Sequence, residues 1–274
     1  MRTSSTTGRQ EQQPDLTQNK VSQSDGSHYT GKISVVGIGP GSLDDMTPRA
    51  RQAIADADLI VGYDTYLDLI KELLSGKASI GTGMMQEIDR CQAAVDQAIA
   101  GKQVAVISSG DPGIYGMAGL ILELVAKQPV VNQPEVTVIP GISAVGAAAA
   151  VLGAPLMHDF AVISMSDLLT PWEVIEKRIE MAAAGDFVIA IYNPKSVKRT
   201  NQIETVRAIT LKYRGPDTPV GIVHHATRDK EAMTLSTLDQ FTHEYIDMFS
   251  LVLIGNSQTY VADGKMVTPR GYRL

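Results

Sequence analysis

Short apolar runs alternate with amphipathic segments from residue 31 onward. Runs of four or more mainly apolar residues are typical of buried strands, whereas apolar positions that recur every three or four residues indicate helices. The predicted strands cover residues 33–36, 59–61, 104–107, 136–139, 160–163, 187–192, 220–223, 231–238 and 251–254, with a short one near residue 80. The predicted helices cover residues 66–74, 86–100, 117–127, 171–184 and 196–213, and two more begin after Thr47 and Ser143. This alternation predicts an α/β fold.

The chain divides into a polar leader and two lobes. Residues 1–30 are mostly Gln, Ser, Thr and Asp, which cannot bury enough apolar surface to offset the entropy of ordering, so we predict a disordered tail. The remaining length suits two α/β lobes, predicted at residues 31–157 and 158–274. The last strands can pair as antiparallel neighbours, so the second sheet should be mixed.

Polar residues mark three helix starts. Thr47 precedes Pro48, and Ser143 precedes an alanine-rich segment, so each is a predicted N-cap. Thr170 and Glu173 flank a proline in the spacing of a capping box, which predicts the start of a third helix.

Composition excludes several functional classes. The chain is 44% apolar and 20% charged, as in globular proteins. Its formal net charge is −6 and its Lys and Arg residues form no block, which argues against a nucleic-acid partner. Cys91 is the single cysteine, so an intrachain disulfide and the usual cysteine metal sites are excluded, and we expect no metal. With no secretory signal, and an apolar run at 141–157 too short for a membrane span, we expect a cytoplasmic protein.

The loop at residues 108–116, Ser-Ser-Gly-Asp-Pro-Gly-Ile-Tyr-Gly, follows a predicted buried strand and precedes a predicted helix. Open α/β sheets bind small molecules outside the carboxyl ends of their strands, where glycines allow close approach. Asp111 precedes Pro112 and is therefore held in extended geometry, which aims its carboxylate. A turn-capping role for Asp111 is an equal alternative. The loop predicts a site for a small, nucleoside-like molecule.

Five further segments at strand ends have both a binding and a structural interpretation. The glycines at 37–41 match the dinucleotide fingerprint poorly, because the third comes one position early and no helix follows directly; a tight turn or a rigid wall for a flat substrate are the alternatives. A helix start at 140–144 favours anions. The asparagines within residues 192–196 and 255–257 have two alternative roles: hydrogen bonding to the edge of a nucleobase or capping of a turn. His224 and His225 point to opposite faces of a strand and cannot hold one metal, but one of them could line an anionic substrate.

Together these blocks identify a family. Residues 37–42, 109–116 and 140–144 resemble the tetrapyrrole methylases, which use S-adenosylmethionine. Residues 61–66, 153–160, 166–173 and 266–272 are similar to the members that methylate ring carbon 17 of precorrin-3B and contract the macrocycle in cobalamin synthesis. The resemblance implies two αβα lobes with the active site in the cleft between them, S-adenosylmethionine bound there, a tetrapyrrole substrate and a homodimer.

The resemblance also implies roles for individual residues. The cofactor would contact Pro40, Ser108, Ser109, Gly110, Asp111, Ile114, Tyr115, Ser143, Ala144, Tyr192, Asn193, Ala226, Gly255 and Asn256. The substrate, with its several carboxylates, would contact Gly39, Gly41, Lys195, Arg199 and Arg228, with Lys198 and Arg270 as further cations. Candidates for acid or base catalysis are Asp111 and His225. The alternatives are another precorrin methyltransferase, a dinucleotide-dependent oxidoreductase or a tetrapyrrole carrier without turnover.

Overall fold

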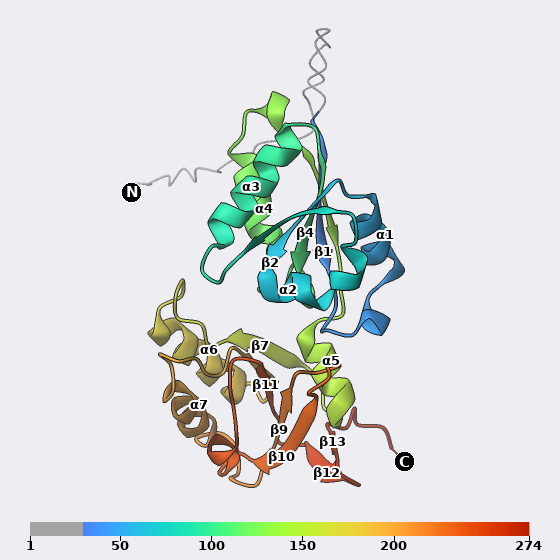
Figure 1. Cartoon of the computed structure of the whole chain (residues 1–274). Coiled ribbons are helices and arrows are strands. Elements are labelled where there is room, and N and C mark those ends of the chain that lie inside the picture. Colours follow the sequence, from blue (N-terminus) through green and yellow to red (C-terminus); the bar gives the residue numbers. More distant parts are fainter. Residues whose placement is uncertain (1–29, 274) are drawn as a thin grey trace, which may run out of the picture.

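The computed structural model describes residues 30–273, which form two lobes, one above the other in Figure 1. Apart from residue 30, the predicted disordered tail lies outside the described residues. Each lobe contains a five-stranded sheet with helices on both faces. The prediction of two αβα lobes is confirmed.

The first lobe is built on a parallel sheet in the order β3-β2-β4-β1-β5. Its strands are β1 (Lys32–Gly37), β2 (Leu59–Tyr63), β3 (Ala78–Thr82), β4 (Gln103–Ser108) and β5 (Glu135–Ile139). Side chains of β1, β2, β4 and β5 enter two different cores on opposite faces of the sheet, whereas β3 contributes only Ile80, to one of them. One core packs under α3 (Glu87–Ile99) and α4 (Ala118–Ala126), and the other under α1 (Pro48–Asp56) and α2 (Asp64–Leu69). All five strands therefore end at the same edge.

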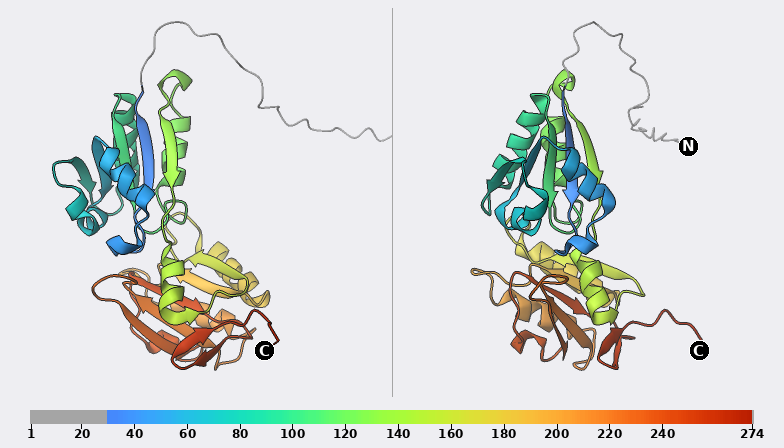
Figure 2. Two further views of the ribbon diagram at one scale, coloured as in Figure 1. Left: turned by 90° about the vertical axis from the view of Figure 1, so that its right-hand side faces the viewer. Right: turned by 45° about the vertical axis from the view of Figure 1, so that its right-hand side comes forward.

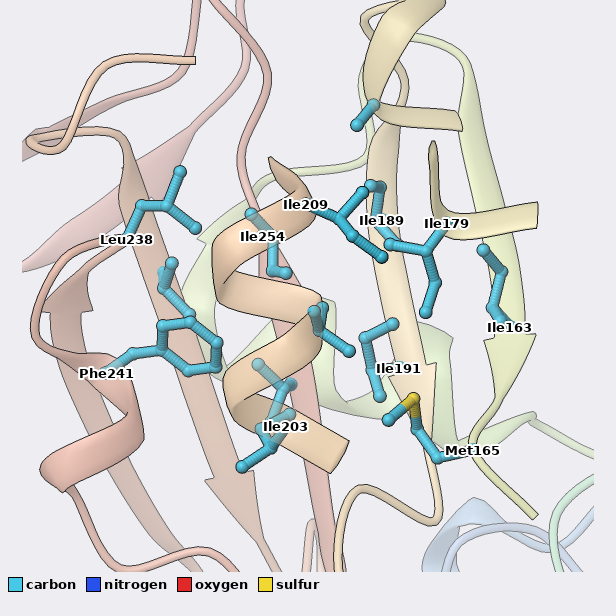
Figure 3. Close-up of a cluster of buried hydrophobic side chains, with 14 of the residues drawn as sticks. Ile163, Met165, Ile179, Ile189, Ile191, Ile203, Ile209, Leu238, Phe241 and Ile254 are labelled. Atoms are coloured by element: carbon cyan, nitrogen blue, oxygen red, sulfur yellow. The ribbon is translucent and has the colours of Figure 1, made fainter. Parts of the chain in front are cut away.

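The second lobe is built on a mixed sheet, as predicted. Its strand order is β10-β9-β11-β8-β7. Its strands are β7 (Phe160–Ser164), β8 (Val188–Tyr192), β9 (Pro219–His224), β10 (Ala232–Thr237) and β11 (Ser250–Ile254). Helices α6 (Trp172–Ala184) and α7 (Gln202–Thr210) cover one face, over a core of isoleucines closed by Phe241 (Figure 3). Strand β11 runs antiparallel to β8 and β9, so its first residue lies at the edge where they end.

Helix α5 (Ala144–Leu152) belongs to the second lobe. Val145, Ala148 and Leu152 pack with residues of β8, β9 and β11, and Figure 2 shows the helix against the lower sheet. A Cβ on Gly221 of β9 would approach Leu152 to 2.5 Å, so a glycine there admits the helix. The predicted boundary at residue 157 is therefore too late, because the core partner of α5 is encoded far downstream and its own alanine-rich sequence does not reveal it.

A three-stranded sheet extends the α5 side of the second lobe. It pairs β6 (Gly153–Ala154), β12 (Tyr260–Ala262) and β13 (Lys265–Val267) in the order β12-β13-β6. The sequence pattern did not predict these strands because each has only two or three residues. Across residues 30–273, no helix combines the length and apolar character needed to cross a membrane.

Two of the three predicted capping interactions at helix starts are present in the structure. Thr47 Oγ1 accepts from the Ala50 N–H at 3.1 Å, and Ser143 Oγ from the Gly146 N–H at 3.4 Å, so both caps are confirmed. The capping box at Thr170 is wrong: Pro171 is the N-cap of α6 and no side chain caps it. The helix predicted at 196–213 is shorter, since α7 begins at Gln202 and a loop precedes it.

Candidate functional site

A cleft between the lobes collects the strand-end loops. The first lobe contributes the turns after β1, β2, β3, β4 and β5, and the second lobe contributes the turns after β8 and β9 and the start of β11. The cleft lining includes residues predicted from sequence, namely Pro40, Ser109, Gly110, Asp111, Ile114, Tyr115, Ser143, Ala144, Tyr192, Asn193, His225, Ala226 and Arg228. Parallel strands of both sheets thus direct their carboxyl ends at one space.

Three glycine-containing loops pack together in the first lobe next to the cleft. Gly39 and Gly110 exchange two backbone hydrogen bonds, at 3.2 and 2.7 Å. A Cβ on Gly141 would lie 2.2 Å from the Gly110 carbonyl oxygen, and one on Gly37 would lie 2.7 Å from the same atom. These contacts are backbone to backbone, so no side-chain movement could relieve them. The glycines after β1 therefore serve close packing of the loops.

The Asp111 carboxylate joins two of these loops. Its Oδ1 accepts from the Gly113 N–H at 2.8 Å within its own turn, and its Oδ2 accepts from the Gly141 N–H at 3.2 Å in the next loop. The turn-capping role of Asp111 is therefore present, and its carboxylate also lies in the cleft lining, where a ligand could reach it. Fixed at both oxygens, the carboxylate is preorganised for a ligand.

Two tyrosines connect the lobes along one wall of the cleft. The Tyr115 hydroxyl donates to the Val162 carbonyl of β7 at 3.1 Å, and the Tyr192 hydroxyl accepts from the Val145 N–H of α5 at 2.9 Å. The two rings meet edge to face, with centroids 5.4 Å apart. Burial raises the pKa of both hydroxyls, so they remain neutral near pH 7.

Arg228 reaches across the cleft from the loop after β9. Its Nε donates to the Pro40 carbonyl at 2.7 Å and its Nη2 to Ser109 Oγ at 3.3 Å. The stem of the side chain covers Gly41, where a Cβ would lie 2.3 Å from Arg228 Cγ. Among residues 30–273 no carboxylate forms an ion pair with this guanidinium, which is partly buried. Burial lowers its pKa, and the nearby Tyr66 opposes the shift.

Backbone strain concentrates around the cleft. Positive φ angles occur at Tyr115 (54°), Asn193 (51°) and His225 (47°), which line it, and at Thr227 (62°) and Met85 (65°), which adjoin lining residues. Non-glycine residues rarely adopt this conformation, and such strain persists where surrounding contacts impose it, commonly at functional sites. The pattern marks the cleft independently of its lining chemistry.

The sequence profile of the tetrapyrrole (corrin/porphyrin) methylases matches residues 32–242 of this chain, which include every lining residue of the cleft from Pro40 to Arg228. The chain belongs to the tetrapyrrole methylase family. This methylase is 54% identical over 242 residues to a probable cobalt-factor III C(17)-methyltransferase of Salmonella typhimurium, covering 88% of this chain and 100% of the relative. It is also 54% identical to the cobalt-factor III methyltransferase of Priestia megaterium, of which it spans 45%.

A solved structure of the methyltransferase CobJ has the same architecture as this methylase. The TM-score is 0.82 at 38% sequence identity, with 88% of this chain and 100% of the CobJ chain covered. The family and the shared architecture establish the protein as a methyltransferase and confirm the fold implied by the sequence blocks.

Gly255 and Asn256, predicted to contact the cofactor, lie outside the cleft. They follow β11, whose antiparallel direction carries its carboxyl end to the opposite edge of the sheet. There Gly255 O accepts from Arg214 and Asn256 is buried against Thr259. The prediction followed the family resemblance and the position of this segment after an apolar strand, and neither determined the direction of β11.

Most residues predicted to contact the substrate also lie outside the cleft lining. Gly39 and Gly41 pack beneath it, Lys195 does not reach it, and Arg199 is buried behind Asn193. Ser108, predicted to contact the cofactor, is buried beside Gly116. Of the further cations expected for the substrate, Arg270 is exposed elsewhere and Lys198 lines a separate hollow near Trp172. Of this group only Arg228 faces the cleft.

Several lining residues were not singled out from sequence. They are Tyr63, Thr65 and Tyr66 on the first lobe, and Val223, Met248, Phe249, Ser250 and Leu251 on the second. Tyr63, Thr65 and Tyr66 lie within the quoted block 61–66, whose strand-end position was an available signal. No comparable signal marks Phe249, because it precedes its strand, and only the tertiary structure stacks it on His225, with ring centroids 5.1 Å apart.

Phe249 is held by a polar cluster at the start of β11. Asp247 accepts from the Phe249 N–H at 2.9 Å, the Ser250 hydroxyl at 2.7 Å and the Tyr245 hydroxyl at 3.1 Å. Burial alone would raise the pKa of Asp247, but these hydrogen bonds outweigh it and leave the pKa below its usual value. Because the Ser250 hydroxyl donates its hydrogen bond to Asp247, its oxygen acts as the acceptor toward His224 Nδ1, 2.9 Å away. In this arrangement His224 carries a hydrogen on Nδ1.

Replacing Asp111 by asparagine should raise the dissociation constant for S-adenosylhomocysteine about 10-fold while lowering the free energy of unfolding by about 1 kcal/mol. An amide has one acceptor oxygen for the two N–H donors of Gly113 and Gly141, and it lacks the charge. Calorimetric titration and thermal unfolding measure the two effects. Asp263→Asn, in the exposed turn between β12 and β13, is the matched control. An unchanged dissociation constant for Asp111→Asn would contradict its placement at the ligand.

Proposed function

We propose that this methylase transfers a methyl group from S-adenosylmethionine to ring carbon 17 of precorrin-3B, or of its cobalt-containing equivalent, with contraction of the macrocycle, in cobalamin biosynthesis. The observation that carries the proposal is the cleft itself, in which loops of both lobes place around one space a carboxylate, two aromatic rings and a guanidinium that has no carboxylate partner among residues 30–273. The 54% identity to the Salmonella relative over its whole length supports the choice of carbon 17.

The chemistry of the inner wall fits the methyl donor. Asp111 offers a carboxylate for a positively charged amino group, and the edge-to-face rings of Tyr115 and Tyr192 offer π-systems to a sulfonium. Ile114 and Ala144 add apolar surface for a flat base. When bound, S-adenosylmethionine supplies a methyl group on a positively charged sulfur that is already activated for transfer.

The outer part of the cleft fits a flat, carboxylate-bearing ring. Tyr63 and Tyr66 stack edge to face with centroids 5.1 Å apart, and Met84 and Phe249 add adaptable and flat apolar surface. Arg228 presents a cation without a carboxylate partner among the described residues, at the boundary between the two parts. A substrate carboxylate would complete its charge-assisted hydrogen bonds.

The protein's own contribution is alignment of the reactants and exclusion of water. The lobes enclose the cleft, and the cross-lobe bonds of Tyr115 and Arg228 fix the relative positions of their loops. His225 lines the cleft next to Arg228 and is the candidate to hold or accept a proton during ring contraction. Both carboxylate oxygens of Asp111 already accept backbone N–H bonds, so they are less available for proton transfer than the His225 side chain.

The dinucleotide alternative loses its structural basis. A pyrophosphate site needs a helix that opens at the last glycine, whereas here a 3-10 turn intervenes and α1 begins at Pro48. The glycines of this loop instead pack against the neighbouring loops.

The deciding experiment supplies precorrin-3B and cobalt-factor III, side by side, with donor carrying a labelled methyl group. We expect label in a ring-contracted product from at least one of the two substrates, and the ratio between them identifies the metal state of the natural substrate. Unlabelled product from both would contradict the proposal. Label at another ring position would favour a different precorrin methyltransferase, and a stoichiometric complex without released product would favour a carrier.

We further propose that the enzyme is a cytoplasmic homodimer, as the family resemblance implies. Light scattering coupled to size-exclusion chromatography measures the oligomeric state, and a mass of one chain at micromolar concentration would contradict this part of the proposal.

A further inference from the structure

Arg199 is 7% exposed and lies behind the cleft, where its side chain is directed at backbone and carboxylate oxygens. Its Nη2 donates to the Asn193 carbonyl at 2.7 Å and its Nη1 to Asp167 Oδ1 at 3.2 Å. An arginine buried this deeply is unable to meet a substrate carboxylate unless the loop unfolds. Its function therefore depends on what Asn193 does.

Asn193 occupies an unfavourable backbone conformation at the cleft. Its φ is 51°, and it precedes Pro194, which further disfavours helical conformations of either hand by steric contact. Its side-chain Nδ2 donates to Ser164 Oγ at 3.0 Å, and this hydrogen bond connects the end of β8 to the end of β7. A residue in this conformation holds its place only where several contacts impose it.

The loop after β8 supplies the principal contact by folding back on itself. Ser196 and Arg199 form a turn in which the Ser196 N–H donates to the Arg199 carbonyl at 3.0 Å and Ser196 Oγ accepts from the Arg199 N–H at 3.1 Å. The turn returns the guanidinium to Asn193, six residues before it. It also explains why the predicted helix at 196–213 starts only at Gln202.

We propose that Arg199 is a positioning residue for the methyl donor: by holding the Asn193 carbonyl and anchoring to Asp167, it fixes Asn193 in the conformation that lines the cleft. The inference rests on the proposed function, because it assigns the donor to the part of the cleft where Asn193 lies. It replaces the expectation, drawn from sequence, of a direct contact between Arg199 and the substrate.

Arg214 provides a matched control. It is equally buried, at 7% exposure, and its guanidinium also donates to backbone carbonyls, those of Phe187 and Gly255. Those carbonyls lie at the edge of the same sheet that faces away from the cleft. A substitution there removes a comparable structural contact without touching the loop of Asn193.

The experiment compares Arg199→Gln, Arg199→Lys and Arg214→Gln by calorimetric titration with S-adenosylhomocysteine and by thermal unfolding. We expect the dissociation constant to rise about 30-fold for Arg199→Gln and about 5-fold for Arg199→Lys, whose single ammonium can reach the carbonyl but not both partners. For Arg214→Gln we expect less than about a 2-fold change in the dissociation constant, although the midpoint of unfolding falls by as much as in Arg199→Gln.

Each outcome decides something. Equal affinity of Arg199→Gln and the unsubstituted enzyme would overturn the inference, as would equal losses of affinity in the two glutamine variants, which would indicate a general effect of stability. If the unsubstituted enzyme does not bind S-adenosylhomocysteine, the proposed function itself fails and the inference fails with it. Weakened binding confined to Arg199 supports the positioning role.

Discussion

Replacing Gly141 by alanine is expected to abolish measurable binding of S-adenosylhomocysteine and to lower the free energy of unfolding by about 3 kcal/mol. The added Cβ would lie 2.2 Å from the Gly110 carbonyl oxygen and 2.8 Å from the Gly37 carbonyl, so the loops after β1, β4 and β5 have to separate. Their separation also lengthens the bond from the Gly141 N–H to Asp111. Thermal or urea unfolding and calorimetric titration measure the two losses.

Gly119→Ala is the control for that substitution. Gly119 lies on an exposed face of α4, with no atom within 4 Å of an added Cβ. Alanine there should leave ligand binding unchanged and raise the free energy of unfolding by up to about 1 kcal/mol, through the better helix propensity of alanine. Normal ligand affinity in Gly141→Ala would show that the three loops tolerate separation and that their close packing does not shape the site.

Replacing Arg228 by methionine should reduce kcat/KM for the tetrapyrrole about 100-fold while changing the dissociation constant for S-adenosylhomocysteine less than about 5-fold. Methionine keeps apolar cover over Gly41 but removes the cation expected to meet a substrate carboxylate. The small change expected in the dissociation constant for S-adenosylhomocysteine comes from the loss of the Arg228 bonds to Pro40 and Ser109. Steady-state kinetics with varied tetrapyrrole and a separate calorimetric titration distinguish the two.

Arg270→Met, in an exposed segment away from the cleft, controls for the loss of a positive charge from the protein as a whole. Its kinetic constants should match those of the unsubstituted enzyme. Should Arg228→Met instead lose donor and tetrapyrrole affinity to the same extent, Arg228 would serve to hold the lobes together and the substrate carboxylate would need another partner.

Local patterns along the chain predicted the elements that local interactions determine. The strands of the first lobe and the caps at Thr47 and Ser143 depend on side-chain periodicity and on a hydroxyl three residues from its N–H partner. The loop containing Asp111 was predicted because every strand of a parallel sheet places its ligand loops at the same edge.

The errors have different physical causes. The direction of β11 was not readable from its apolar sequence, so Asn256 was placed at the wrong edge, and Phe249 at the opposite end of that strand was missed. The residue type of Arg199 does not show whether its side chain faces the cleft or is buried. Only the turn that returns it to Asn193 shows that it is buried. The capping box failed because the proline between its polar residues is itself the cap.

The chain passes between the lobes once within the described residues, at residues 140–143 between β5 and α5, and the adjoining Ser143 and Ala144 line the inner part of the cleft. Rotation of one lobe against the other would break the cross-lobe bonds of Tyr115 and Arg228 and would pivot about this link, so displacement would grow with distance from it. Met84 and Phe249, each 53% exposed, stand on opposite lobes and would separate more than groups beside the pivot. A bulky ring could then enter and leave through the widening gap while a donor seated at the link keeps its contacts. If the donor binds beside the link as proposed, we expect it to bind before the tetrapyrrole and its spent form to leave last.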